Sequence, residues 1–169
     1  MSTHHTHEPS IAVYPGTFDP ITMGHTDIIN RALDLFDKVI VAVAVNSAKD
    51  PVFSLEERMQ MIEETFKDHD RIQISSVSGL LVDYAYRQNA KAIVRGIRAV
   101  SDFDYEFQLA LMNRKLNRDV ESVFLMPGFR WIFISSSIIK DAARNGGDVS
   151  DLVPPHVDSK LKEKFFPRK

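Results

Sequence analysis

The segment KVIVAVAV, residues 38–45, constrains the fold of this chain most strongly, because it is apolar at almost every position. A strand with one face in water alternates polar and apolar residues, whereas a strand inside a parallel sheet is covered on both faces and lacks that alternation. The run is too short to span a bilayer. It therefore predicts a buried strand of a parallel sheet.

Strand-like and helix-like segments alternate along the rest of the chain. We expect strands at 10–14, 38–45, 71–75, 91–95 and 121–126, and helices at 24–36, from Ser54 to about Phe66, at 80–88, at 101–117, from Ser135 or Ser136 to Gly146, and at 155–166. This order predicts an α/β fold: a Rossmann-like open five-stranded parallel sheet with helices on both faces and C-terminal helices.

Composition narrows the function classes. The 169 residues are 44% hydrophobic and 26% charged, as in an ordinary water-soluble domain, and they include no cysteine. Zinc–thiolate sites and thiol nucleophiles are therefore excluded. A net charge of −2 argues against a nucleic-acid partner. The N-terminus has no apolar leader and no run is long enough for a membrane span, so we expect a cytoplasmic protein without membrane contact.

Three of the six histidines lie in the N-terminal stretch MSTHHTHEPS. They could bind a metal weakly or be remnants of cloning. We interpret residues 1–9 as a disordered tail and residues 10–169 as a single domain.

Ligands of open parallel sheets bind beyond the carboxyl ends of the strands, where the strand order reverses. The corresponding segments are 15–25, 46–53, 76–81, 95–100 and 127–137. Cationic or titratable side chains gather in these segments, namely His25, Lys49, Arg95 and Arg98. A cationic pocket in a nearly neutral protein favours a small anionic substrate.

The stretch YPGTFDPITMGH, residues 14–25, leads from the first strand into the first helix. Gly16 would let the backbone turn sharply or approach a ligand without a Cβ in the way, and Gly24 would do the same where the helix begins and its N–H groups are unpaired. His25 lies in the first helical turn, where its ring could donate to an anion. The alternative, a capping turn with a packed histidine, is less consistent with two glycines and two prolines in so short a turn.

Two further motifs could bind phosphate. Arg95-Gly96-Ile97-Arg98 would bring two guanidinium groups to one loop, although both could instead pair with Asp102 or Asp104. Ser135, Ser136 and Ser137 begin a helix, where hydroxyls either cap it or bind phosphate.

No nucleophilic triad, P-loop lysine or paired histidine at metal-ligand spacing accompanies these motifs outside the tail. The pattern predicts direct transfer between two phosphate-bearing substrates, with catalysis by positioning and charge neutralisation.

Taken together, Thr22-Met23-Gly24-His25, RGIRAVSDFDYE and the serine motif Ile134–Lys140 resemble the nucleotidyltransferase superfamily with the [HT]-x-G-H signature, and within it the phosphopantetheine adenylyltransferase family. The resemblance runs from Tyr14 to about residue 155. It implies transfer of the adenylyl group of ATP, with Mg²⁺, to 4′-phosphopantetheine, giving dephospho-coenzyme A and pyrophosphate. It also implies a homohexamer and possible feedback inhibition by coenzyme A.

The same resemblance implies roles for individual residues. His25, helped by Thr17, would stabilise the transition state, and Thr17, Lys49, Leu81 and Arg95 would bind 4′-phosphopantetheine. ATP would be bound by Thr17, Phe18, His25, Gly96, Ile97, Arg98, Glu106, Trp131, Ile132, Phe133, Ile134, Ser135, Ser136 and Ser137. Lys140 stands where other branches have arginine, which makes a direct phosphate contact by Lys140 uncertain, and no ligand for Mg²⁺ is assigned.

The helix expected at 101–117 has two opposed apolar faces. One carries Phe103, Phe107 and Leu111, and the other carries Tyr105, Leu109, Met112 and Leu116. A helix of this kind is usually packed on both sides, so we expect one face on the sheet and the other on a further helix or a second subunit.

Two other functions agree less well with these motifs. A cytidylyltransferase or a nicotinamide mononucleotide adenylyltransferase is disfavoured by the complete RGIRAVSDFDYE motif. A non-catalytic nucleotide sensor is disfavoured because His25, Lys49, Arg95 and Arg98 occur together.

Overall fold

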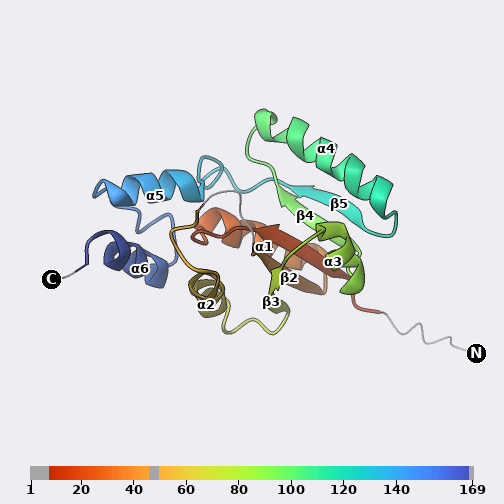
Figure 1. Ribbon diagram of the computed structural model, residues 1–169, viewed down its shortest axis with the longest axis horizontal. Helices are drawn as coiled ribbons and strands as arrows, with labels where there is room; N and C mark the ends of the chain where they lie inside the picture. Colours follow the sequence, from red (N-terminus) through yellow and green to blue (C-terminus); the bar gives the residue numbers. More distant parts are fainter. Residues whose placement is uncertain (1–7, 46–49, 168–169) are drawn as a thin grey trace, which may run out of the picture.

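The structure is a computed structural model that describes residues 8–45 and 50–167 (Figure 1). Residues 1–7 of the predicted tail, and Lys49, lie outside the described residues. Residues 8 and 9 belong to no helix or strand.

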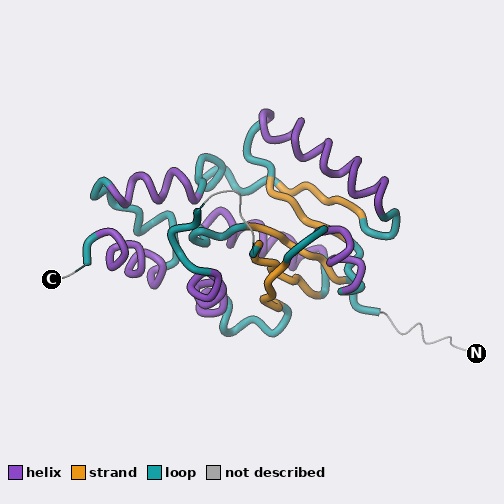
Figure 2. The backbone as a smooth tube through the Cα atoms, viewed as in Figure 1, coloured by secondary structure: helices purple, strands orange, loops and turns teal. Residues whose placement is uncertain are grey.

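All the predicted strands and helices are present, and their ends agree with the predictions to about two residues (Figure 2). The strands are β1 (Ile11–Gly16), β2 (Lys38–Ala44), β3 (Ile72–Val77), β4 (Ala92–Gly96) and β5 (Glu121–Leu125). The helices are α1 (Met23–Leu35), α2 (Leu55–Thr65), α3 (Leu81–Arg87), α4 (Val100–Leu116), α5 (Ser136–Arg144) and α6 (Pro155–Phe165).

Local sequence signals explain where several helices begin. Thr22 caps α1, and Ser135 caps α5 by accepting a hydrogen bond from the Ile138 N–H at 3.2 Å. Ser54 and Glu57 form the predicted capping box of α2, in which each side chain accepts a hydrogen bond from the other residue's N–H.

The five strands form one sheet in the order β3-β2-β1-β4-β5, and every neighbouring pair is parallel. After β1 the chain adds β2 and β3 on one side and then crosses to add β4 and β5 on the other. The strand order therefore reverses at β1, and the predicted Rossmann-like architecture is confirmed.

The core lies in two layers, one on each face of the sheet. On one face, Ala12, Tyr14, Val39 and Val41 pack with buried residues of α1, α2, α5 and α6. On the other face, Val13, Ile40 and Ile93 pack with buried residues of α3. In Figure 1, α4 runs alongside β4 and β5, while α5 and α6 lie side by side at the end of the molecule away from the N-terminus.

Helix α4 differs from its prediction. Phe103 contacts the Phe124 ring of β5, with ring centroids 6.1 Å apart, yet Phe103, Phe107 and Leu111 are all more than 40% exposed. The one buried residue of α4 is Glu106. The helix thus turns the strip that contains Glu106 towards the sheet and leaves apolar side chains exposed on both flanks. No helix in the described part of the chain is both long and apolar enough to cross a membrane.

Candidate active site at the carboxyl edge of the sheet

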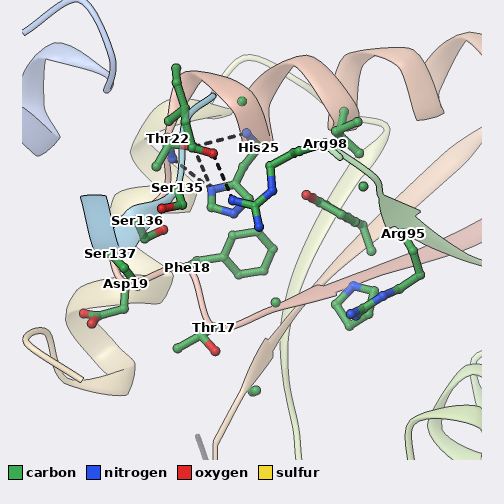
Figure 3. Close-up of a pocket in the computed structure, with 18 of the residues that line it drawn as sticks. Thr17, Phe18, Asp19, Thr22, His25, Arg95, Arg98, Ser135, Ser136 and Ser137 are labelled. Carbon is green, nitrogen blue, oxygen red and sulfur yellow. Dashed lines mark hydrogen bonds between the residues drawn. The ribbon is translucent and has the colours of Figure 1, made fainter. Parts of the chain in front are cut away.

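A cavity of about 940 Å³ opens at the carboxyl ends of the strands, where the strand order predicts a ligand site. Its wall includes the turn after β1, the last residue of β2, the loop after β3, the end of β4 and the start of α5. Figure 3 labels side chains of the turn after β1, the start of α1, the end of β4 with the loop after it, and the start of α5, and it shows His25, Phe18 and Arg98 close together.

Most of the predicted site residues line this cavity: Thr17, Phe18, His25, Leu81, Arg95, Gly96, Arg98, Glu106, Trp131, Ile134, Ser135, Ser136 and Ser137. Ile97, Ile132 and Phe133 are not part of the lining, and Phe133 is 62% exposed. Their contacts with ATP remain predictions. Lys49 cannot be placed, because it lies outside the described residues.

The turn after β1 departs from one of its two predictions, the sharp turn at Gly16. Gly16 has no positive φ; the left-handed residue is Phe18, with φ of 49°. A Cβ on Gly16 would lie 2.9 Å from the Phe18 ring, so Gly16 provides room for that ring. At Gly24 a Cβ would make only ordinary contacts, 3.6 Å from Thr22 Oγ1, so the packing of the protein itself does not require glycine there.

Thr22 caps α1 and orients the His25 ring, so the alternative of a capping turn with a packed histidine holds in part. The Thr22 N–H donates to Nδ1 at 3.1 Å, and Thr22 Oγ1 lies 3.0 Å from the same nitrogen. The His25 N–H in turn donates to Thr22 Oγ1 at 3.3 Å, so the proton of the Thr22 hydroxyl can be directed towards Nδ1. Because a backbone N–H can only donate, Nδ1 must accept, and the neutral ring carries its proton on Nε2.

The surroundings keep this ring neutral. Burial, and then the positive charge of Arg98, lower the pKa of His25 from 6.5 to about 4. The Phe18 ring meets the imidazole edge-on, with centroids 5.0 Å apart. His25 lines the cavity and is only half-buried. It is therefore a hydrogen-bond donor through Nε2, and a cationic form is disfavoured.

The two arginines of the RGIR turn are both engaged. Arg95 forms a bidentate ion pair with Glu106, with Nε–Oε2 and NH2–Oε1 distances of 2.7 and 2.6 Å. Burial acts to lower the pKa of Arg95. The hydrogen bonds and the negative charge of Glu106 have the larger effect together, so the pKa is raised. Arg98 donates to the Ile134 carbonyl at 3.1 Å and lies 3.5 Å from Asp102. The alternative of pairing with Asp102 thus holds in part for Arg98, while the partner of Arg95 is Glu106.

The serines of the third motif have different local tasks. Ser135 caps α5, as one of the two interpretations predicted, and Ser136 donates to the Pro20 carbonyl at 2.8 Å. The latter bond ties α5 to the turn after β1, so the first and third motifs form one wall of the cavity.

The lining also includes residues that were not among the predicted site residues, and three of these, Tyr14, Asp19 and Lys140, carry polar or charged side chains with marked burial or pairing. Asp19 is almost fully buried; it accepts hydrogen bonds from the N–H groups of Val52 and Phe53 and forms an ion pair with Lys140. Burial raises the pKa of the Tyr14 hydroxyl well above its usual value. A carboxylate in a turn after a buried strand is a sequence signal that could have indicated Asp19.

The cavity has no built metal site among the described residues, which contain no cluster of three or more His, Cys, Asp or Glu residues that could hold a metal. Its two carboxylates, Asp19 and Glu106, are each paired with a basic side chain. The residues present do not fit a protein-held metal ion.

Comparison with known proteins agrees with this geometry. The family model described as cytidylyltransferase-like matches residues 13–142. A phosphopantetheine adenylyltransferase of Desulfotalea psychrophila is 66% identical over 170 residues, covering 99% of this chain and all of the relative. One from Desulfosudis oleivorans is 61% identical over 155 residues, covering 92% of each chain.

A solved structure of a bifunctional NMN adenylyltransferase/ADP ribose pyrophosphatase from Francisella tularensis is similar in fold, with a TM-score of 0.67 at 19% identity. The match covers 92% of this chain and 50% of that one. With the fold, the cavity and the full-length relatives in agreement, the chain belongs to the cytidylyltransferase-like family and, within it, to the phosphopantetheine adenylyltransferases.

Proposed function

We propose that this chain transfers the adenylyl group of ATP to 4′-phosphopantetheine, giving dephospho-coenzyme A and pyrophosphate. The observation that carries the proposal is the position of His25, which lines the cavity after the strand where the sheet order reverses and whose Nδ1 accepts from the Thr22 N–H, so that Nε2–H is the donor of the neutral ring. Such a position lies between two half-sites, one over β2 and β3 and the other over β4 and β5.

The two half-sites suit two substrates. ATP would lie over β4 and β5, near Gly96, Arg98, Glu106 and the stretch from Trp131 to Ser137. The pantetheine arm would lie over β2 and β3, near Thr17, Leu81 and Lys49, with Arg95 at the boundary. The phosphates of both substrates would then meet beside His25.

The chemistry requires no protein nucleophile. An oxygen of the 4′-phosphate attacks the α-phosphorus of ATP, the bond from that phosphorus to the β-phosphate bridging oxygen breaks, and pyrophosphate leaves. The attacking phosphate is already ionised near neutral pH, so no base has to remove a proton. His25 Nε2–H, helped by Thr17, would donate a hydrogen bond to the α-phosphate oxygen on which negative charge develops in the transition state. A donor that is already oriented, in a site partly shielded from water, stabilises such charge effectively.

We propose that Mg²⁺ enters as part of the substrate MgATP. The carboxylates of Asp19 and Glu106 are each paired with a basic side chain, which disfavours their binding the ion. In proteins, Mg²⁺ is commonly held by substrate phosphates and water.

The working form would be a cytoplasmic homohexamer. The exposed apolar side chains on both flanks of α4 support association, because contiguous apolar surface of this kind is usually covered. Coenzyme A shares its pantetheine and adenylyl parts with the product, so we also propose that it competes for the cavity as a feedback inhibitor.

Replacing His25 tests the reaction and the role of the histidine. His25→Ala should lower kcat by about 100- to 1000-fold, as expected when one transition-state donor is lost, with little change in ATP affinity. Pyrophosphate release from MgATP and 4′-phosphopantetheine gives kcat, and calorimetry gives the affinity. Absence of pyrophosphate with the wild-type protein would refute the proposed reaction; an unchanged kcat in the variant would refute the role of His25.

The protonation state of His25 can be followed directly. Because its folded pKa is lowered from 6.5 to about 4, the folded state stays neutral while the unfolded state takes up a proton, so this group destabilises the fold as pH falls from 6.5 towards 4. Nitrogen-15 NMR should find Nε2 protonated and Nδ1 bare down to about pH 5. His25→Gln should flatten the loss of stability over that window. A ring that titrates near 6.5 would contradict the neutral-donor assignment.

Assembly through α4 predicts that wild-type protein sediments as a hexamer at micromolar concentration. Leu116→Glu, at a position that is 49% exposed, should shift the protein to smaller species. A charge buried in an apolar contact between subunits would be desolvated without an opposite charge to compensate it. Leu35→Glu on α1, where Leu35 is 59% exposed, is the matched control and should leave assembly unchanged. A monomeric wild type would disprove this part of the proposal.

A further inference from the structure

Arg58 lies directly behind the wall of the cavity without being part of its lining. It belongs to α2, is only 1% exposed, and is among the largest fully buried side chains in the described chain. Its NH1 nitrogen donates to the Thr17 carbonyl at 2.7 Å and to the Ala44 carbonyl at 3.1 Å. Thr17 and Ala44 both line the cavity, so Arg58 joins the turn after β1 to the end of β2 from behind.

The contacts of Arg58 with main-chain carbonyls orient that wall. The third acceptor is the Ser54 carbonyl, 3.3 Å from Nε. Phe18, which follows Thr17, has the left-handed φ of 49° that ordinary side chains rarely adopt. Because a peptide unit is planar and trans, turning the Thr17 carbonyl towards Arg58 turns the Phe18 N–H to the opposite side. The carbonyl oxygens of Thr17 and Ala44, which would repel a phosphate, are thus directed towards Arg58.

The charge of Arg58 is also unusual in its surroundings. Among the described residues no carboxylate forms an ion pair with its guanidinium, and the carboxylate of Glu56, which interacts with its charge, is exposed to solvent. Arg95, Arg98 and Lys140, which line the cavity, each pair with a carboxylate. A buried cation is costly unless an opposite charge compensates it. An anion bound on the cavity side of Thr17 and Ala44 would supply that compensation.

We propose that Arg58 is a positioning residue for the acceptor half-site, which sets the wall formed by Thr17 and Ala44 and favours the phosphate of the acceptor through its buried positive charge. The inference rests on the proposed function, since it takes the acceptor to be a phosphorylated pantetheine whose arm lies over β2 and β3 and whose phosphate lies beside Thr17. It adds that the preference for the phosphorylated arm over the unphosphorylated one depends on a residue that the ligand does not touch.

The test measures that preference by calorimetry, as the ratio of affinities for 4′-phosphopantetheine and pantetheine. Arg58→Gln keeps an amide donor but removes the charge, and should lower the ratio about tenfold, chiefly by weakening the phosphorylated ligand. Arg58→Lys keeps the charge and should hold the ratio within about threefold of wild type. If Arg58→Gln does not fold, as judged by circular dichroism, Arg58→Met is the second neutral variant.

Arg71→Gln is the matched control. Arg71 also donates to a main-chain carbonyl, that of Leu33 at 2.9 Å, but it immediately precedes β3 and so lies at the opposite edge of the sheet. The control should leave the ratio unchanged. If a neutral Arg58 variant weakens both ligands equally, or neither, Arg58 is only a structural residue and the inference is overturned. If wild-type protein does not bind 4′-phosphopantetheine, the proposed function itself fails.

Discussion

β1 pairs in parallel with β2 on one side and with β4 on the other, and its residues from Ala12 to Pro15 are buried. This position leaves the turn that follows β1 between the loops that follow β2 and β4. Thr17, Phe18 and His25 therefore lie at the centre of the cavity, while the RGIR turn and the serine motif approach from one side. The location of the site follows from strand order before any side chain is considered.

Within that frame, buried charged groups hold the loops together. Asp19 accepts two main-chain N–H groups of the loop after β2 and pairs with Lys140 of α5, while Arg58 binds the carbonyls of Thr17 and Ala44. Fully satisfied polar contacts of this kind can fix one loop geometry, whereas a partner lost from one of them leaves a buried group unpaired. These contacts therefore hold the loops around the cavity in one arrangement.

The sequence predicted the fold almost completely, because hydrophobic periodicity and capping residues are local signals. The apolar run at 38–45 and the Ser54–Glu57 capping box correspond to β2 and the start of α2. Motif positions also predicted which segments meet, since the carboxyl ends of parallel strands share one edge. What could not be predicted depends on tertiary contacts. The Arg95–Glu106 and Asp19–Lys140 ion pairs join residues that come together only in the folded chain. The left-handed conformation of Phe18 likewise has no local sequence signal.

We propose that the adenylyl group passes from ATP to the acceptor in a single in-line step, with His25 as a neutral donor and no covalent intermediate on the protein. The most direct measurement uses ATP made chiral at the α-phosphorus with one sulfur, and determines the configuration of the thiophosphate in the product. A single displacement inverts that configuration, which is the predicted result. Net retention would indicate two displacements through an adenylylated side chain, and would contradict the account.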